Sequence, residues 1–323
     1  MMTTRRQWLT DTLAGAALGS LAGPWAAFAA PAGRPLVLGQ SVPLTGDASE
    51  IGLAFAAGAK LYIDSYNSRS DIPARIELRQ VDDAYDATRA AANAKQLLAE
   101  GADVLFGFVG TASSVAAADV AKAQSSLLVA PFAAPDLLRD AAHAQVFHVR
   151  PSMADEAFKM VQHCATMGLT RIALLGEEGL MGQAGQAAVS GALASLKLPP
   201  LVATAFVALN GAQVSAAVTQ VKAANPQAII QASLFKSTAA FIRGMRKSGY
   251  AGAFLNFSAV GIDPLYTALG KDIGGVVVSQ VVPSPAMQGY DAGGFRVNLR
   301  GATREAAAAI DLVSISADGR VIR

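Results

Sequence analysis

Residues 104–114, VLFGFVGTASS, are the stretch that decides the fold class. Val104–Phe108 is a continuous apolar run, which is typical of a parallel strand buried on both faces. A helix is expected directly after it, over Ala112–Gln124, and a second apolar run follows at Leu127–Ala130. A strand, a helix and a strand joined by such short loops indicate a parallel sheet covered by helices.

The same alternation continues toward the N-terminus. From Ala48 to Asn67, apolar side chains recur every three or four residues, which predicts a helix with one buried face. Arg75–Val81 alternates and is typical of a strand close to a sheet edge. The next helix is expected to begin at Asp86, which can cap it, and to end at Gly101. Two more strands complete this first series, Leu36–Gln40 and Val146–Val149.

The pattern restarts after Arg150-Pro151. A helix is expected over Asp155–Met167, with Gly168 as its end. Helices at about 182–195, 213–224, 237–248 and 264–269 alternate with five strands, at Ile172–Leu175, Leu201–Val207, Ala228–Gln231, Ala253–Phe257 and Val276–Val282. Two such series predict an α/β protein of two lobes, each a mostly parallel sheet with helices on both faces.

The lobes are expected at residues 30–150 and 151–282, followed by a tail at residues 283–323. In the tail, Val313 and Ile315 alternate before Asp318-Gly319, and Val321 follows, which is typical of a β-hairpin. We expect this hairpin to pack on lobe 2.

The first residues are expected to be an export signal. Arg5-Arg6 precedes Trp8-Leu9, and a weakly apolar run ends in Ala27-Phe28-Ala29, a small-x-small cleavage site. The pattern predicts a twin-arginine (Tat) type signal over residues 1–29, cleaved near Ala29, and a periplasmic mature protein. The alternative is an uncleaved membrane anchor, but the run is short and contains Gly and Pro.

Composition narrows the function classes. The chain has 323 residues, of which 52% are hydrophobic and 15% charged, and this excludes a disordered chain. The formal net charge is +2 with basic residues spread along the chain, so no nucleic-acid partner is expected. Cys164 is the single cysteine, and we expect it to be a buried, inert thiol. The spacing of His143, His148 and His163 fits no common metal motif, so no metal is expected.

The loop at Gly107–Ser114 is a candidate anion site. Ligands of open parallel sheets bind beyond the carboxyl ends of the strands, where helix N-termini meet. This loop has small and hydroxylated residues at the start of a helix, so its backbone N–H groups are placed to hold a carboxylate. The alternative is simple N-capping by Thr111 or Ser113.

Other motifs offer little catalytic chemistry. Glycines recur every third residue from Gly176 to Gly185, which is not the spacing of a dinucleotide fingerprint. The acidic pairs Asp82-Asp83 and Glu177-Glu178 are more typical of solvated loops or helix caps than of an acid–base pair. The sequence also lacks a phosphate-binding loop and a nucleophile elbow. No catalytic residue and no cofactor are therefore expected.

Several motifs, taken in order, resemble one family. They are Gly39-Gln40-Ser41-Val42-Pro43-Leu44-Thr45-Gly46, Val81-Asp82-Asp83-Ala84-Tyr85, Phe106-Gly107-Phe108-Val109-Gly110-Thr111, Ala239-Ala240-Phe241-Ile242-Arg243 with Ser248-Gly249-Tyr250, and Val278-Ser279-Gln280-Val281-Val282-Pro283. Together they resemble the periplasmic leucine/isoleucine/valine-binding protein family, which are solute receptors of ABC importers with a type I periplasmic-binding fold. The resemblance implies a small carboxylate or amino acid bound between lobes that close about a hinge, and an inner-membrane ABC permease as partner.

The resemblance also implies a ligand site, position by position. Thr111, Ala112 and Ser113 would hold the ligand carboxylate through a hydroxyl and backbone N–H groups. Ala133 would add a backbone contact.

Four further positions would surround the rest of the ligand. Ile51, Met181 and Phe235 fall where the family places side-chain-pocket residues. Ser258 falls where amino-acid-binding members carry an acid that pairs with the ammonium group. Since a buried ammonium without a carboxylate partner is costly, Ser258 favours an aromatic or aliphatic acid that lacks an amine. Glu177-Glu178 could substitute from the facing lobe.

The chain departs from the family after Pro285. It goes almost directly to Gly293-Gly294-Phe295-Arg296-Val297, where relatives run on for some tens of residues that return to the first lobe. Loss of those packed helices predicts exposed apolar surface on lobe 1.

Two other functions remain open from the sequence. A sensory module of the same fold would present its ligand state to a membrane kinase or chemoreceptor. An exported α/β enzyme would carry a bound cofactor with its own absorbance.

Overall fold

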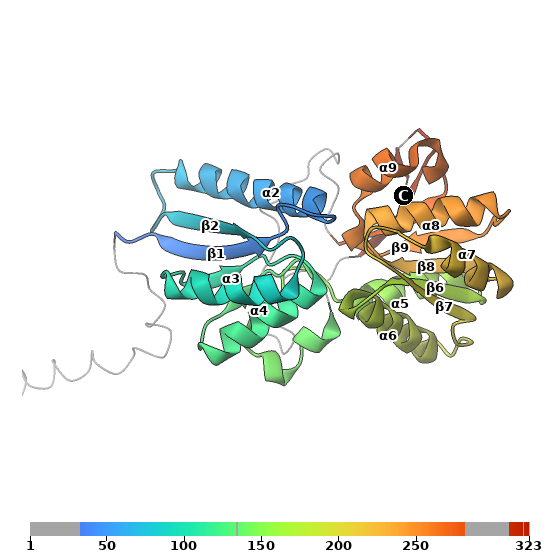
Figure 1. The fold of residues 1–323 in the computed structure, drawn as a ribbon, viewed down its shortest axis with the longest axis horizontal. Coiled ribbons are helices and arrows are strands. Elements are labelled where there is room, and N and C mark those ends of the chain that lie inside the picture. The colour runs from blue at the N-terminus through green and yellow to red at the C-terminus, as the bar shows by residue number, and fades with distance from the viewer. Residues whose placement is uncertain (1–32, 134, 282–309, 319, 323) are drawn as a thin grey trace, which may run out of the picture.

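The computed structural model describes residues 33–133, 135–281, 310–318 and 320–322, and it has two lobes (Figure 1). Each lobe is a sheet with helices on both faces, so the α/β fold class is confirmed. Three parts of the sequence predictions lie outside the described residues. They are the signal peptide over residues 1–29, the end of the predicted strand at Val282, and the segment from Pro285 to Val297.

Lobe 1 is built on a parallel five-stranded sheet with the order β2-β1-β3-β4-β5. Its strands are β1 (Leu36–Val42), β2 (Ile76–Asp82), β3 (Val104–Phe106), β4 (Leu128–Val129) and β5 (Val146–Phe147). β2 is an edge strand, as its alternating sequence predicted. Leu105 and Leu128 on the inner strands are fully buried, as expected of continuous apolar runs.

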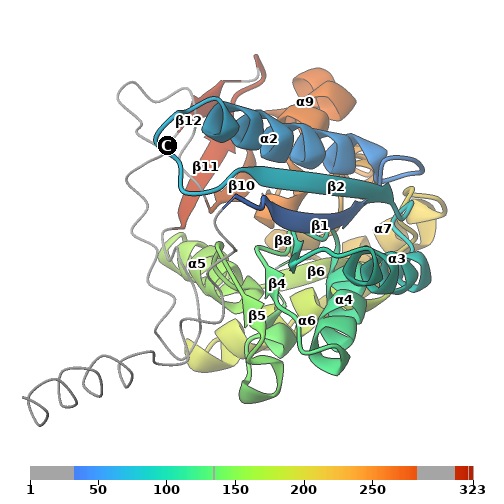
Figure 2. The ribbon, with the colours of Figure 1, turned by 90° about the vertical axis from the view of Figure 1, so that its left-hand side faces the viewer.

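Helix α2 (Ser49–Asn67) covers one face of this sheet, and α3 (Ala87–Ala99) and α4 (Thr111–Ala123) cover the other (Figures 1 and 2). The Asp86 side chain caps α3 by accepting a hydrogen bond from the N–H of Arg89, as predicted. Gly101 follows α3 with a φ of +91°, which ends the helix. Two short 3-10 helices, Asp136–Leu138 and Ala141–His143, precede β5.

Helix α2 exposes several large apolar side chains to solvent. Leu53, Leu61 and Tyr62 are 51%, 74% and 71% exposed, while Ile63 on the opposite face is buried. The helix therefore shows the exposed apolar surface that the short tail predicted for lobe 1.

Lobe 2 is built on a seven-stranded sheet with the order β12-β11-β10-β9-β8-β6-β7. Its strands are β6 (Ile172–Glu177), β7 (Ala203–Val207), β8 (Ala228–Ala232), β9 (Ala253–Asn256), β10 (Val276–Gln280), β11 (Asp311–Ile315) and β12 (Val321–Ile322). The strands from β6 to β10 pair in parallel, whereas β11 pairs antiparallel with both β10 and β12. The tail thus forms a hairpin that extends the sheet of lobe 2.

Helices α5 (Met153–Thr166) and α6 (Leu180–Ser195) pack together on one face of this sheet, and α7 (Val214–Ala223), α8 (Phe235–Lys247) and α9 (Ile262–Leu269) lie on the other (Figure 1). Short 3-10 helices span Ser258–Val260 and Gly270–Ile273. α5 begins before the predicted Asp155, because Ser152 and Asp155 form a capping box. Every residue of β6 and β8 is buried between the two helical layers. No helix in the described ranges combines the length and hydrophobicity needed to cross a bilayer.

Candidate functional site

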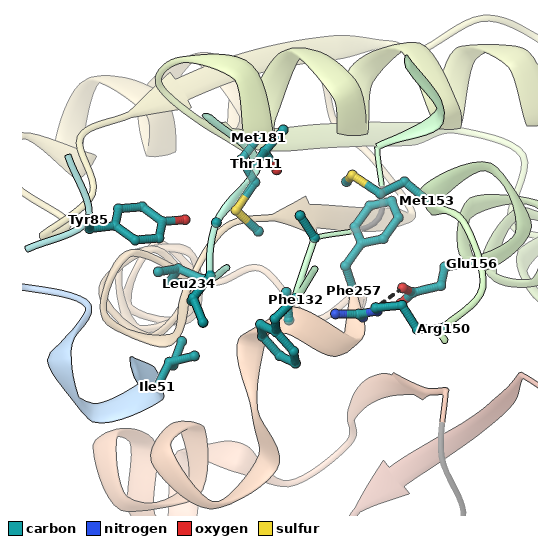
Figure 3. Close-up of a pocket in the computed structure, with 14 residues that line it drawn as sticks. Ile51, Tyr85, Thr111, Phe132, Arg150, Met153, Glu156, Met181, Leu234 and Phe257 are labelled. Atoms are coloured by element: carbon teal, nitrogen blue, oxygen red, sulfur yellow. Dashed lines mark hydrogen bonds and ion pairs between the residues drawn. The ribbon is translucent and has the colours of Figure 1, made fainter. Parts of the chain in front are cut away.

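A cavity lies where the two lobes meet (Figure 3). The space between its lining atoms is about 470 Å³ and includes a part that is open to solvent. Lobe 1 and the connection to lobe 2 contribute Ile51, Tyr85, Val109, Gly110, Thr111, Phe132, Ala133 and Arg150, and lobe 2 contributes Met153, Glu156, Met181, Leu234, Phe257 and Ala259. A small, mostly apolar molecule would be enclosed by both lobes here.

The N-terminus of α4 opens into this cavity. The residue that precedes the helix is Gly110, with a φ of +98°, and no side chain caps the helix. The interpretation of Thr111 or Ser113 as an N-cap is therefore wrong. The N–H groups of Thr111, Ala112 and Ser113 form no hydrogen bond with any described residue. These free donors, at the positive end of a helix dipole, favour an anion.

A tight loop after β2 places Tyr85 at the cavity. Asp82 holds the loop, because its carboxylate accepts hydrogen bonds from the N–H groups of Leu44 and Ala84 at 2.8 and 2.9 Å and from the Thr45 hydroxyl at 2.6 Å. These donors outweigh partial burial and lower the pKa of Asp82 to about 2.

Gly110 is required for the position of Tyr85. A Cβ at residue 110 would lie 2.5 Å from the Tyr85 ring, so only glycine leaves room for it. The ring directs its hydroxyl toward the middle of the cavity (Figure 3). Burial, with the nearby charges of Glu177 and Asp83, raises the pKa of Tyr85, so its hydroxyl keeps its proton.

A buried ion pair forms the end of the cavity that lies away from Tyr85 (Figure 3). Arg150 follows β5, where the chain leaves lobe 1, and its Nη2 lies 3.3 Å from Oε1 of Glu156 in the first turn of α5. Their side chains are 7% and 1% exposed. The guanidinium also lies 4.8 Å from the centre of the Phe132 ring, which belongs to lobe 1.

Ser258 completes this cluster from lobe 2. Its hydroxyl accepts a hydrogen bond from Arg150 and donates one to Oε1 of Glu156 at 3.0 Å, and its N–H donates to Oε2 at 2.8 Å. The Ser279 hydroxyl also donates to Oε2 of Glu156. An acid is therefore present at this end of the cavity, but it comes from α5 and is already bonded.

Glu177 is buried rather than solvated. Its Oε2 accepts hydrogen bonds from the N–H of Leu234 at 2.9 Å and from the Ser237 hydroxyl at 3.4 Å. Burial nevertheless raises the pKa of Glu177 to about 7. Its side chain does not line the cavity and instead positions the start of α8, so it gives no support to a role in pairing a ligand ammonium.

The structure brings together some of the expected site residues. Ile51, Thr111, Ala133 and Met181 line the cavity. Ser258 lies beside it, in the cluster with Arg150, and lines a neighbouring cleft together with Ile51.

The other expected residues do not reach the cavity. The Ala112 and Ser113 side chains are not among its lining groups, although their N–H groups belong to the open helix end. The Phe235 side chain, at the start of α8, is instead buried in an apolar cluster that contains residues of both lobes.

Sequence reasoning missed Tyr85, Phe132, Arg150, Glu156 and Phe257. Arg150 was treated only as the boundary between two series of elements, and Glu156 has the pattern of an acid in a first helical turn. A single signal could have found Arg150, namely a lone cation placed directly after a buried strand at the crossing between the lobes.

Two other chemistries receive no support from the described part of the chain. Its His, Cys, Asp and Glu side chains form no group of three or more arranged to hold a metal ion. The Cys164 thiol is buried, and burial raises its pKa to about 12, so it is not a nucleophile.

A family model described as periplasmic binding protein matches residues 35–315. Comparison with curated proteins finds no match.

Several solved structures share this fold. One is described as a possible leucine/isoleucine/valine-binding protein from Rhodopirellula baltica, with a TM-score of 0.81 and 22% identity over 91% of this chain and 98% of that one. A substrate-binding periplasmic protein from Ralstonia solanacearum has a TM-score of 0.79 and 23% identity over 89% and 99%. An ABC transporter solute-binding protein from R. palustris, solved in complex with benzoate, has a TM-score of 0.70 and 18% identity over 79% and 71%. The first two matches cover nearly the full length of the matched proteins.

Proposed function

The chain belongs to the periplasmic binding protein family, and from that premise we propose that it is a solute receptor that binds a small carboxylate between its two lobes. The observation that carries this proposal is the uncapped N-terminus of α4, whose free N–H groups open into a cavity lined by both lobes. A carboxylate there would satisfy donors that have no partner among the described residues.

The rest of the cavity supports an apolar ligand body. Ile51, Phe132, Met181, Leu234 and Phe257 surround the space beyond α4. The benzoate complex of a protein with this fold is consistent with an aromatic or aliphatic acid as ligand.

The ligand is proposed to lack an amine. Ser258 carries no charge to pair with an ammonium group, and Glu156 beside it is bonded to Arg150 and Ser258. A desolvated ammonium without a carboxylate partner would be costly. Branched-chain amino acids are therefore the weaker candidates within the same receptor function.

The proposed physiological role is delivery of this ligand to an inner-membrane ABC permease, without any chemical change to it. Export by the Tat-type signal of residues 1–29 would place the mature protein in the periplasm. Closure of the two lobes around the ligand would create the surface that the permease recognises.

A thermal-shift panel on the mature chain tests this function. The panel contains aromatic acids, short aliphatic acids, the matching amides and branched-chain amino acids. A ligand at 100 times its Kd should add about 2.7 kcal/mol to the free energy of unfolding. Acids are expected to raise the Tm, and amides are not, because they bring no charge to α4. A cooperative melt that no acid shifts would contradict the proposal.

A further inference from the structure

The Glu156 carboxylate has no acceptor capacity left for a ligand. A carboxylate offers about four lone-pair sites. Arg150 and the Ser258 hydroxyl occupy Oε1, and the Ser258 N–H and the Ser279 hydroxyl occupy Oε2. A positively charged ligand group would find no free acidic oxygen at this end of the cavity.

Arg150 has donor capacity left over. Its Nη2 donates hydrogen bonds to both Glu156 and Ser258. Among the described residues, Nη1 has no hydrogen-bond partner, and the buried Nε has none either. The residue is only 6% exposed and lines the cavity. The guanidinium extends from Glu156 toward Phe132, so that one nitrogen points away from the ion pair (Figure 3). Buried donors without a partner are costly, and a ligand oxygen would relieve that cost.

We propose that Arg150 donates to a second oxygen of the ligand and is the specificity-determining residue of the site. The receptor then selects carboxylates that carry a further acceptor oxygen without a positive charge, such as an oxo acid or a dicarboxylic acid. This inference rests on the proposed function, because the first carboxylate is assigned to α4. The Tyr85 hydroxyl, a protonated donor, adds to the same preference.

The ligand series that tests this inference changes one group at a time. Leucine, α-ketoisocaproate and isocaproate share a carbon skeleton and carry an ammonium, an oxygen or only hydrogens next to the carboxylate. Glutarate and pentanoate differ by a second carboxylate. Calorimetric titration of the mature protein should give at least tenfold tighter binding for α-ketoisocaproate than for isocaproate, or for glutarate than for pentanoate, with leucine the weakest of its series.

Variants assign the preference to Arg150. Arg150→Gln alone would leave Glu156 buried and unpaired, so we use Arg150→Gln/Glu156→Gln and compare it with Glu156→Gln, which keeps the guanidinium. The preference for the second oxygen should fall below threefold in the double variant and persist in Glu156→Gln. Arg69→Gln is the control, since Arg69 is exposed and, within the described ranges, forms an ion pair only with Asp71.

The outcomes separate this inference from the function on which it rests. If the wild-type protein binds isocaproate and pentanoate as tightly as the oxygen-bearing acids, or leucine most tightly, the role of Arg150 is refuted while carboxylate binding stands. This comparison needs no variant, so it decides even if the double variant does not fold. A preference that survives in a folded double variant also refutes it. If no carboxylate binds at all, both the function and the inference fall.

Discussion

Glu177 makes stability depend on pH through a single buried carboxyl. Its pKa is raised from 4.5 to about 7 in the folded protein. The unfolded chain therefore loses this proton first, and the free energy of unfolding falls as pH rises from about 4.5 to about 7. Above that range the cost is constant, and below it the cost disappears.

Glu177→Gln should remove this dependence, because a glutamine oxygen can still accept the Leu234 N–H without a buried charge. The variant should gain stability over wild type between pH 5 and pH 8 by an amount on the order of 2–3 kcal/mol, measured by urea unfolding. The comparison isolates Glu177, because all other groups are the same in the two proteins, and Asp82 has completed its titration below this range. Parallel pH profiles for the two proteins would show that Glu177 does not titrate there.

Met181 tests the apolar part of the cavity. Its side chain lines the cavity, so a ring in place of the thioether leaves less room for a ligand. Met181→Phe should weaken the binding of an aromatic acid such as benzoate at least fivefold, measured by calorimetry. Met167→Phe is the matched control, because Met167 is 64% exposed at the end of α5. Equal affinities in all three proteins would remove Met181 from the site.

At the residue scale, the sequence pointed to the helix end but not to the ion pair. The run Gly110-Thr111 is local, and the chemistry of an uncapped helix can be predicted from it. The pair of Arg150 and Glu156 acts only because Ser258, more than a hundred residues later, folds against it. A pattern read along the chain contains no information about that contact.

Helix α6 offers a prediction at the scale of an element, because two of its glycines have opposite surroundings. A Cβ on Gly182 would lie 2.0 Å from the carbonyl oxygen of Glu177, whereas a Cβ on Gly191 would meet nothing within 4 Å. Gly182→Ala should therefore move α6 and cost about 1–3 kcal/mol.

Gly191→Ala should instead stabilise the protein by about 0.5–1 kcal/mol, through helix propensity alone. Urea unfolding of both variants measures the difference. If both substitutions stabilise, α6 does not rest on the end of β6 as closely as the structure places it.

The elements themselves were predictable because local and tertiary demands agree. The central strands β6 and β8 are buried along their whole length, and continuous apolar runs in the sequence predicted them. Helix starts were less predictable. α5 begins at Met153 because the Ser152 hydroxyl and the Asp155 carboxylate cap it reciprocally, while apolar periodicity becomes visible only after that first turn.

At the scale of the whole molecule, the two-lobe architecture followed from the repeated alternation, and the order of strands did not. Periodicity gives no reason why β8 rather than β7 lies between β6 and β9. The sequence motif predicted a hairpin, but it did not predict the strand with which the hairpin pairs. β11 runs antiparallel to β10 and so extends the sheet at that strand.

The exposed side chains of α2 lead to a prediction about the solubility of the whole molecule. Leu61 is 74% exposed and Ile63, two residues away on the same helix, is 6% exposed. Leu61→Lys should change the free energy of unfolding by less than about 0.5 kcal/mol and slow aggregation in light scattering, because it removes a large exposed apolar side chain. Ile63→Lys should cost several times more, since it buries an unpaired charge. A loss above about 2 kcal/mol for Leu61→Lys would mean instead that another surface covers this face in solution.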